Sequence, residues 1–157
     1  MNIIFSILSN KIVYPSLVTM VCTQILKILI DFYRNKKLNY KLLFGMGGMP
    51  STHAASVASL VTSLARYEKD GTGSLGFGSS LVFALIVMYD AAGIRRSAGQ
   101  QAIIINKVVE RLEDANGKRI IKNNLTEVLG HTPIEVVMGA VFGFLLSWFM
   151  CYVFDPA

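Results

Sequence analysis

The chain has 157 residues, of which 53% are hydrophobic and 16% charged, and its formal net charge is +5. With a mean hydropathy of +0.50, this composition argues against an ordinary soluble domain and favours one membrane-embedded domain over residues 1–157. In so apolar a chain, basic loops beside anionic lipid head groups explain the positive charge better than nucleic-acid binding does. Cys22 and Cys151 both lie in apolar runs, which predicts buried side chains and neither a disulfide nor a metal site.

Apolar segments predict an all-α fold, a multi-pass transmembrane helical bundle with about four membrane helices. Residues 1–10 are apolar but too short to cross a bilayer, which takes about 20 residues, so an interfacial or packed helix is expected there. Four later segments suit a crossing, namely residues 12–33, 51–66, 76–92 and 130–154. We therefore expect a multi-pass protein of the cell membrane.

Residues 93–125 differ from these segments because they are rich in arginine and lysine. Apolar side chains still recur there at helical spacing, at Ala98, Ala102, Ile105, Val109 and Leu112. This pattern predicts an amphipathic helix on or against the cytoplasmic side of the membrane, with a break at Asn116-Gly117.

The distribution of basic residues predicts the topology. Residues 34–49 carry four and residues 93–125 carry seven, whereas residues 67–75 carry only Lys69. By the positive-inside rule the first two segments lie in the cytoplasm, and residues 67–75 and both termini lie outside. The polar residues that then converge near the cytoplasmic face are Arg34, His53, Asp90, Arg95, Arg96 and His131.

Gly47 to His53, with the sequence GGMPSTH, is the stretch around which the chain is organised. Pro50 suits the first turn of a helix, where its missing N–H has no cost. Ser51 or Thr52 can cap the free amides of that turn. Free N–H groups and hydroxyls at a helix start also favour an anion such as phosphate.

His53 and His131 are the two histidines of the chain, and each stands at the start of an apolar helix. Glu135 follows His131 by four residues, so its carboxylate can reach the imidazole from one turn away. A carboxylate on one ring nitrogen fixes the tautomer and makes the other nitrogen a better base or nucleophile. The alternative is a helix-start pair without chemistry.

Four cations are candidates for binding phosphate. Lys27 and Arg34 are seven residues apart on one face of the first long helix, and charges at membrane depth are costly and tend to be functional. Arg95 and Arg96 offer the planar donors that bind phosphate bidentately. The alternatives are snorkelling of Lys27 or its pairing with Asp31, and a role of the two arginines as interfacial anchors.

Three other kinds of site find little support. Two histidines and scattered carboxylates lack zinc-ligand spacing, so we expect no metal and no cofactor. Gly45 to Pro50 lacks the Gly-Lys-Ser/Thr of a Walker loop. No nucleophile-elbow pattern surrounds Ser51.

Together these residues resemble the motifs of the type 2 phosphatidic acid phosphatase and vanadium haloperoxidase superfamily, and most closely its small divergent membrane branch. Lys27 and Arg34 keep the spacing of the first motif, with Asn35 in place of its proline. Pro50-Ser51-Thr52-His53 resembles the second motif, Pro-Ser-Gly-His. The phrases that resemble the divergent branch are GGMPSTHAA, YDAAGIRRSAGQQA and LGHTPIEVVMGA, and the similarity covers about residues 12–150.

The third motif is altered. His131 and Glu135 resemble its second half, with glutamate for the usual aspartate, while Asn123-Asn124-Leu125 stands where its arginine is expected. Arg95 or Arg96, earlier in the chain, is the expected substitute.

The resemblance implies a metal-independent hydrolase of lipid phosphates or polyprenyl diphosphates. It implies that His131 is the nucleophile that forms a phosphohistidine, that Glu135 orients it and that His53 protonates the leaving group. It implies a phosphate cradle formed by Lys27, Arg34, Ser51, Thr52, Arg95 and Arg96. Gly48 is expected to support this cradle, whereas Asp90 has no counterpart in the superfamily motifs and is expected to position Arg95 or Arg96 or to pair with a basic residue. The expected partners are a lipid phosphate substrate and membrane lipids, and self-association into a homo-oligomer is left open.

A non-catalytic membrane protein that binds a lipid phosphate, or anchors a partner through residues 97–115, is the alternative. His131 and Glu135 separate the two hypotheses, because a binding site needs cations and not an imidazole oriented by a carboxylate.

Overall fold

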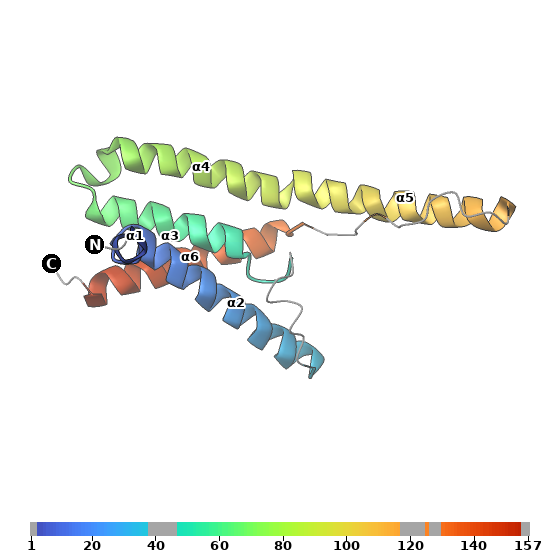
Figure 1. The fold of residues 1–157 in the computed structure, drawn as a ribbon, viewed down its shortest axis with the longest axis horizontal. Helices are drawn as coiled ribbons and strands as arrows, with labels where there is room; N and C mark the ends of the chain where they lie inside the picture. The colour runs from blue at the N-terminus through green and yellow to red at the C-terminus, as the bar shows by residue number, and fades with distance from the viewer. Residues whose placement is uncertain (1–2, 38–46, 117–124, 126–129, 155–157) are drawn as a thin grey trace.

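The computed structural model describes residues 3–37, 47–116, 125 and 130–154, and these are helices joined by turns, without strands (Figure 1). The elements are α1 (Ile3–Leu8), α2 (Val13–Asn35), α3 (Thr52–Tyr67), the 3₁₀ turn η2 (Gly71–Gly73), α4 (Leu75–Ala92), α5 (Ile94–Asn116) and α6 (Pro133–Phe154). The all-α prediction is confirmed.

Helix α3 lies at the centre of the bundle and packs against α2, α4 and α6. It runs antiparallel to α2, because Lys27 contacts Thr52 while Thr19 contacts Ser59. It runs parallel to α6, so the first residues of both helices lie at the same end of the bundle. This parallel arrangement brings the segments around the two histidines together.

The α3–α6 contact is close because small residues recur every four positions along both helices. A methyl group on Gly139 or Gly143 would overlap the backbone carbonyl of Ser51 or Ala55. One turn later the Ser147 hydroxyl donates to the carbonyl of Ser59 at 3.1 Å. Small residues that allow close backbone approach, and hydroxyls that bond across helices, are typical of packing within membranes.

Among the described residues, three helical segments are long and apolar enough to cross a membrane, namely Val13–Asn35, Leu75–Leu112 and Pro133–Val153. The fourth expected segment, residues 51–66, is α3, which has 16 residues and spans about 24 Å. This helix is shorter and more polar than the other three, and its Ser59 and Ser63 hydroxyls contact Thr19 of α2 and Ser147 of α6.

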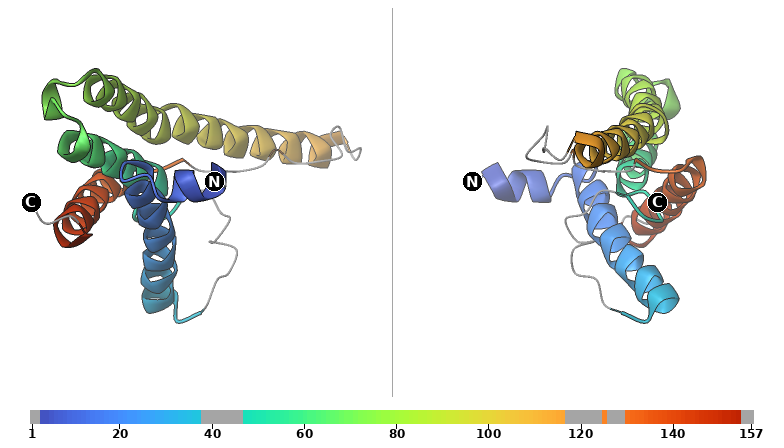
Figure 2. Two further views of the ribbon diagram at one scale, coloured as in Figure 1. Left: turned by 60° about the vertical axis from the view of Figure 1, so that its left-hand side comes forward. Right: turned by 90° about the vertical axis from the view of Figure 1, so that its right-hand side faces the viewer.

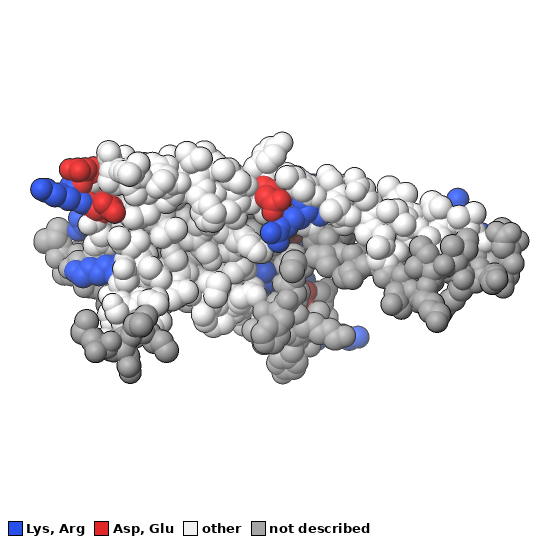
Figure 3. Space-filling model, turned by 45° about the horizontal axis from the view of Figure 1, so that its top comes forward, with Lys and Arg blue, Asp and Glu red and all other residues white. Residues whose placement is uncertain are grey.

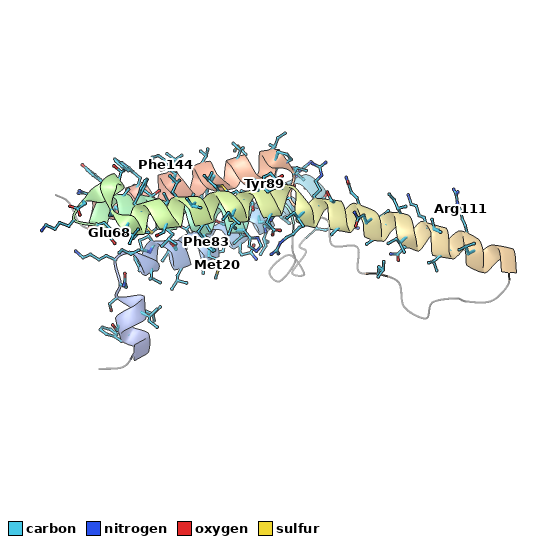
Figure 4. The ribbon with its side chains drawn as sticks, turned by 90° about the horizontal axis from the view of Figure 1, so that it is seen from above. Met20, Glu68, Phe83, Tyr89, Arg111 and Phe144 are labelled. Carbon is cyan, nitrogen blue, oxygen red and sulfur yellow. The ribbon has the colours of Figure 1, made fainter. Side chains whose placement is uncertain are left out.

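The outer faces of the bundle are apolar. Met20, Phe83 and Phe144 are 44%, 55% and 48% exposed (Figure 4). Apolar exposure on this scale marks an interaction surface in a soluble protein. Here it suits contact with lipid.

Helix α5 continues the direction of α4 and extends beyond the other helices as the end of one long rod (Figures 1 and 2). Helical backbone hydrogen bonds continue through the junction between α4 and α5. The N–H of Gly93 donates to the carbonyl of Tyr89, and the N–H of Ser97 donates to the carbonyl of Gly93, each at 2.9 Å. The sequence predicted an amphipathic helix on or against the membrane here, and α5 is that separate helix, which follows α4 in nearly the same direction. The expected end at Asn116 agrees with the end of α5, whereas Gly117 lies outside the described residues.

Candidate functional site

Two helix starts meet at the centre of the site. The Ser51 hydroxyl accepts a hydrogen bond from the N–H of Ala54 at 3.4 Å and caps α3, and the Ser51 N–H donates to the carbonyl of Glu135 at 3.0 Å. Ser51 is fully buried. The cap is therefore Ser51, and the expected place of Pro50 inside the first turn is wrong, because the helix begins at Thr52.

His131 is held by α6 and by the end of α4. Its ring Nδ1 lies 3.3 Å from Oε2 of Glu135. Its backbone N–H donates to the backbone carbonyl of Ala91 at 3.0 Å. The residue is only 4% exposed. The expected reach of Glu135 to the imidazole is thus present.

Glu135 has a second partner. Its Oε2 accepts from the N–H of Thr132 at 2.9 Å, while the N–H of Glu135 donates to the Thr132 hydroxyl at 3.3 Å. This reciprocal pair is a capping box, which stabilises a helix start. The same carboxylate therefore begins α6 and orients His131.

The charge state of His131 follows from its surroundings. Burial lowers the pKa of His131 below its ordinary value of 6.5, although Glu135 and a hydrogen bond with the backbone of Gly48 act in the opposite direction. The imidazole is therefore neutral near pH 7. In the tautomer that the carboxylate favours, the proton is on Nδ1 and the lone pair is on Nε2.

His53 lies against His131, with ring centroids 6.0 Å apart and the ring planes at 66°. This is the edge-to-face geometry that aromatic rings prefer. His53 is exposed where His131 is buried. Arg95, Lys27 and Asp90 are close enough to act on His53 electrostatically.

Lys27 is buried beside the start of α3. Its Nζ donates to the Thr52 hydroxyl at 3.1 Å, and that hydroxyl donates to Gln24 Oε1 at 2.9 Å. Lys27 is 3% exposed, so it does not snorkel to the surface. Asp31 accepts instead from the amide of Asn35 at 2.7 Å.

Gly48 fits closely against Lys27. Its φ of +83° lies in the left-handed region, and an added Cβ would lie 3.3 Å from Cδ of Lys27. Both facts favour glycine at this position. Gly48 therefore supports the site by letting its backbone approach Lys27 and His131.

A cavity of about 230 Å³ lies beside the C-terminal half of α2. This half of the helix diverges from the rest of the bundle (Figures 1 and 2). Its size suits a head group better than a whole lipid, since pockets for drug-sized ligands start at about 300 Å³. It is lined by Lys27, Ile30, Asp31, Arg34, Gly48, Met49, Thr132, Ile134 and Glu135. The cavity thus joins two predicted cations to Glu135, while the histidines, Ser51, Arg95 and Arg96 do not line it.

Arg95 and Asp90 form an ion pair at the junction of α4 and α5, where basic and acidic side chains lie together in Figure 3. Nε of Arg95 lies 2.6 Å from Oδ2 of Asp90. The backbone of Arg96 packs against Gly130, where a methyl group would overlap its nitrogen. Within the described part of the chain, the Arg96 side chain forms no ion pair.

Several residues of the site were not predicted from the sequence. Gln24 and Asp31 are polar residues on the predicted face of α2, and Met49 lies inside the organising stretch. The Thr-x-x-Glu spacing of Thr132 and Glu135 was a signal for the capping box. Among the described residues, no group of three or more His, Cys, Asp and Glu is placed to hold a metal ion.

The family described as "Divergent PAP2 family" matches residues 8–146. The chain belongs to the divergent PAP2 family. It is 38% identical over 157 residues to the "Uncharacterized membrane protein YuiD" of Bacillus subtilis (strain 168), an alignment that covers 94% of this chain and 98% of that protein. No solved structure matches the chain significantly. The resemblance drawn from the motifs is confirmed, and the chain is a PAP2-related membrane protein.

Proposed function

We propose that this divergent PAP2 protein is a metal-independent phosphatase of lipid phosphates or polyprenyl diphosphates in the cell membrane, with its site at the cytoplasmic face. The observation that carries the proposal is the contact of His53 with His131, whose Nδ1 is held by Glu135 at 3.3 Å. A site that only binds phosphate has no need of a buried imidazole fixed by a carboxylate.

In the proposed reaction, Nε2 of His131 attacks phosphorus and the bond from phosphorus to the leaving oxygen breaks. His53 gives that oxygen its proton, so the lipid leaves as an alcohol or a monophosphate. Water then attacks the phosphohistidine, His53 takes a proton from it, and phosphate leaves with His131 neutral again. A buried neutral imidazole suits the nucleophile, and the exposed His53 can exchange protons with solvent between the two steps.

The cations stabilise the negative charge that develops on the phosphoryl oxygens during the reaction. Lys27 is fixed by Thr52 before substrate arrives, and donors fixed in this way stabilise transferring phosphoryl groups. Arg34 lines the cavity, and Arg95 acts on His53. Arg95 or Arg96 takes the place of the arginine that the altered third motif lacks. Ser51 contributes by fixing the start of α3.

A second candidate function is binding of a lipid phosphate without turnover. It is favoured by the burial of His131 and by the cavity, whose lining contains Lys27 and Arg34 but neither histidine. In that case Glu135 has only the structural role of capping the start of α6.

Phosphate release by the purified full-length chain tests the proposal. The substrates are phosphatidic acid, phosphatidylglycerophosphate and a polyprenyl diphosphate, each with and without a chelator. We expect chelator-resistant release that vanadate inhibits and that His131→Gln and His53→Gln abolish, while Lys69→Gln, at the opposite end, retains it. Binding of these lipids without release would support the second candidate, and release abolished by the chelator would exclude the metal-free mechanism.

A further inference from the structure

A second cavity lies at the opposite end of the α3–α6 pair. It has a volume of about 220 Å³ and is lined by Thr62, Arg66, Trp148, Cys151 and Tyr152. His53 and Arg66 are thirteen residues apart on α3, which is about 20 Å along a helix. The cavity is therefore separate from the histidine site.

Arg66 brings a positive charge to this cavity. Among the described residues it forms neither an ion pair nor a hydrogen bond. The nearby acid Glu68 lies against α4, since Gly76 has its carboxylate as a close neighbour. Within the described ranges no acidic group therefore occupies the guanidinium, and its planar donors suit phosphate.

The rest of the cavity is suited to lipid. Trp148 and Tyr152 are 57% and 70% exposed, and Phe149 and Leu145 extend the apolar outer face of α6. Tryptophan and tyrosine beside a basic residue at the end of a membrane helix are typical of the head-group level. The Thr62 hydroxyl is bonded to the carbonyl of Ala58 at 2.8 Å, which leaves Arg66 as the anion-binding group.

We propose that this cavity binds the phosphate of an anionic phospholipid, whose acyl chains lie along the outer face of α6. The charge of Arg66 selects the anionic head group, and the aromatic walls select a lipid over a free anion. The site lies in the leaflet opposite to the histidine pair and is independent of the proposed catalysis.

Trp148 is the only tryptophan of the chain and lines the cavity, so its fluorescence reports on the site. The full-length chain is reconstituted in phosphatidylcholine vesicles that contain a small fraction of brominated phosphatidylglycerol or of brominated phosphatidylcholine. We expect the anionic lipid to quench Trp148 with a binding preference of about fivefold, or about 1 kcal/mol. Arg66→Gln should abolish the preference, Arg66→Lys should keep part of it, and the matched control Lys69→Gln should keep all of it.

Three results would overturn the proposal. Equal quenching of the wild-type chain by both brominated lipids would show that no anionic lipid is selected, whatever the variants do. An unchanged preference in Arg66→Gln would remove Arg66 from the site. Loss of the preference on addition of soluble glycerol phosphate would assign the cavity to a free anion.

Discussion

Oε2 of Glu135 lies 3.3 Å from Nδ1 of His131, and the same oxygen accepts the N–H of Thr132. One carboxylate thus has a structural role in starting α6 and a chemical role in orienting the imidazole. The two roles need different properties of the side chain. The helix start needs an acceptor, and the imidazole needs a negative charge.

Glu135→Gln separates these roles because glutamine also completes a capping box. We expect the free energy of unfolding of this variant to lie within about 1 kcal/mol of the wild-type value. Its rate of phosphate release should fall by about 100-fold. Glu135→Ala should lose both the helix cap and the orientation of the imidazole. Its free energy of unfolding should be lower than that of Glu135→Gln by about 0.5–2 kcal/mol. Release rates and thermal unfolding in detergent measure the two effects. Undiminished release by Glu135→Gln would leave Glu135 with the structural role alone.

The pH dependence of the chain should report on His131. Burial holds the pKa of His131 below 6.5 in the folded state, so the unfolded chain binds more protons at acidic pH. The free energy of unfolding should therefore be highest above pH 6.5 and fall as the pH drops below that value. Phosphate release should fall at a more acidic pH than for an ordinary histidine, since the nucleophile must be neutral.

Urea unfolding and release rates, each measured as a function of pH, test this prediction. The His131→Gln variant is the control for stability, and its unfolding should lose the part of the acid dependence that His131 causes. If the wild type and His131→Gln show the same dependence, the titrating group lies elsewhere.

The local parts of the site were predictable from the sequence because they depend on spacing within one helix. Lys27 and Arg34, and His131 and Glu135, lie together as their seven- and four-residue separations required. The convergence of the two histidines followed from the charge of the loops, which sets the direction of each helix. Their contact, however, depends on how closely α3 and α6 approach.

That approach was not predicted, because it depends on which face of each helix meets the other. Gly139 and Gly143 were read only as parts of an apolar segment, yet they allow the contact. The capping role of Ser51 was expected, but its complete burial follows from the same packing. The alignment of α5 with α4 depends on the backbone of Gly93, where glycine is compatible with both a turn and a continued helix.

Gly143→Ala tests the close packing of the bundle. The added methyl group would overlap the backbone of Ala55, and backbone cannot move aside as a side chain can. We expect a loss of about 1–3 kcal/mol in the free energy of unfolding. Gly78→Ala in α4 is the matched control, because nothing lies within 4 Å of its added Cβ. That change should stabilise the helix by up to about 1 kcal/mol, and a similar gain at Gly143 would contradict the packing.

Lys27→Met tests the buried cation. Methionine keeps most of the apolar stem against Gly48 but removes the charge and the hydrogen bond to Thr52. We expect phosphate release to fall by about 100-fold, while thermal unfolding changes little. Lys36→Met, an exposed lysine over the ring of Tyr33, is the control and should retain release. A stable Lys27→Met protein with normal release would exclude Lys27 from phosphate binding.

Asp90 should act through Arg95, since their side chains are 2.6 Å apart. The pair is partly exposed, with 51% and 32% of the side-chain surface accessible for Arg95 and Asp90, so its contribution to stability should not exceed about 1 kcal/mol. If Asp90 positions the arginine beside His53, then Asp90→Asn should lower kcat more than it raises KM, and should have no added effect in an Arg95→Gln background. A double-mutant cycle on release rates measures this coupling. Independent effects of the two substitutions would show that Asp90 does not position Arg95, and would favour Arg96 as the substitute for the arginine missing from the third motif.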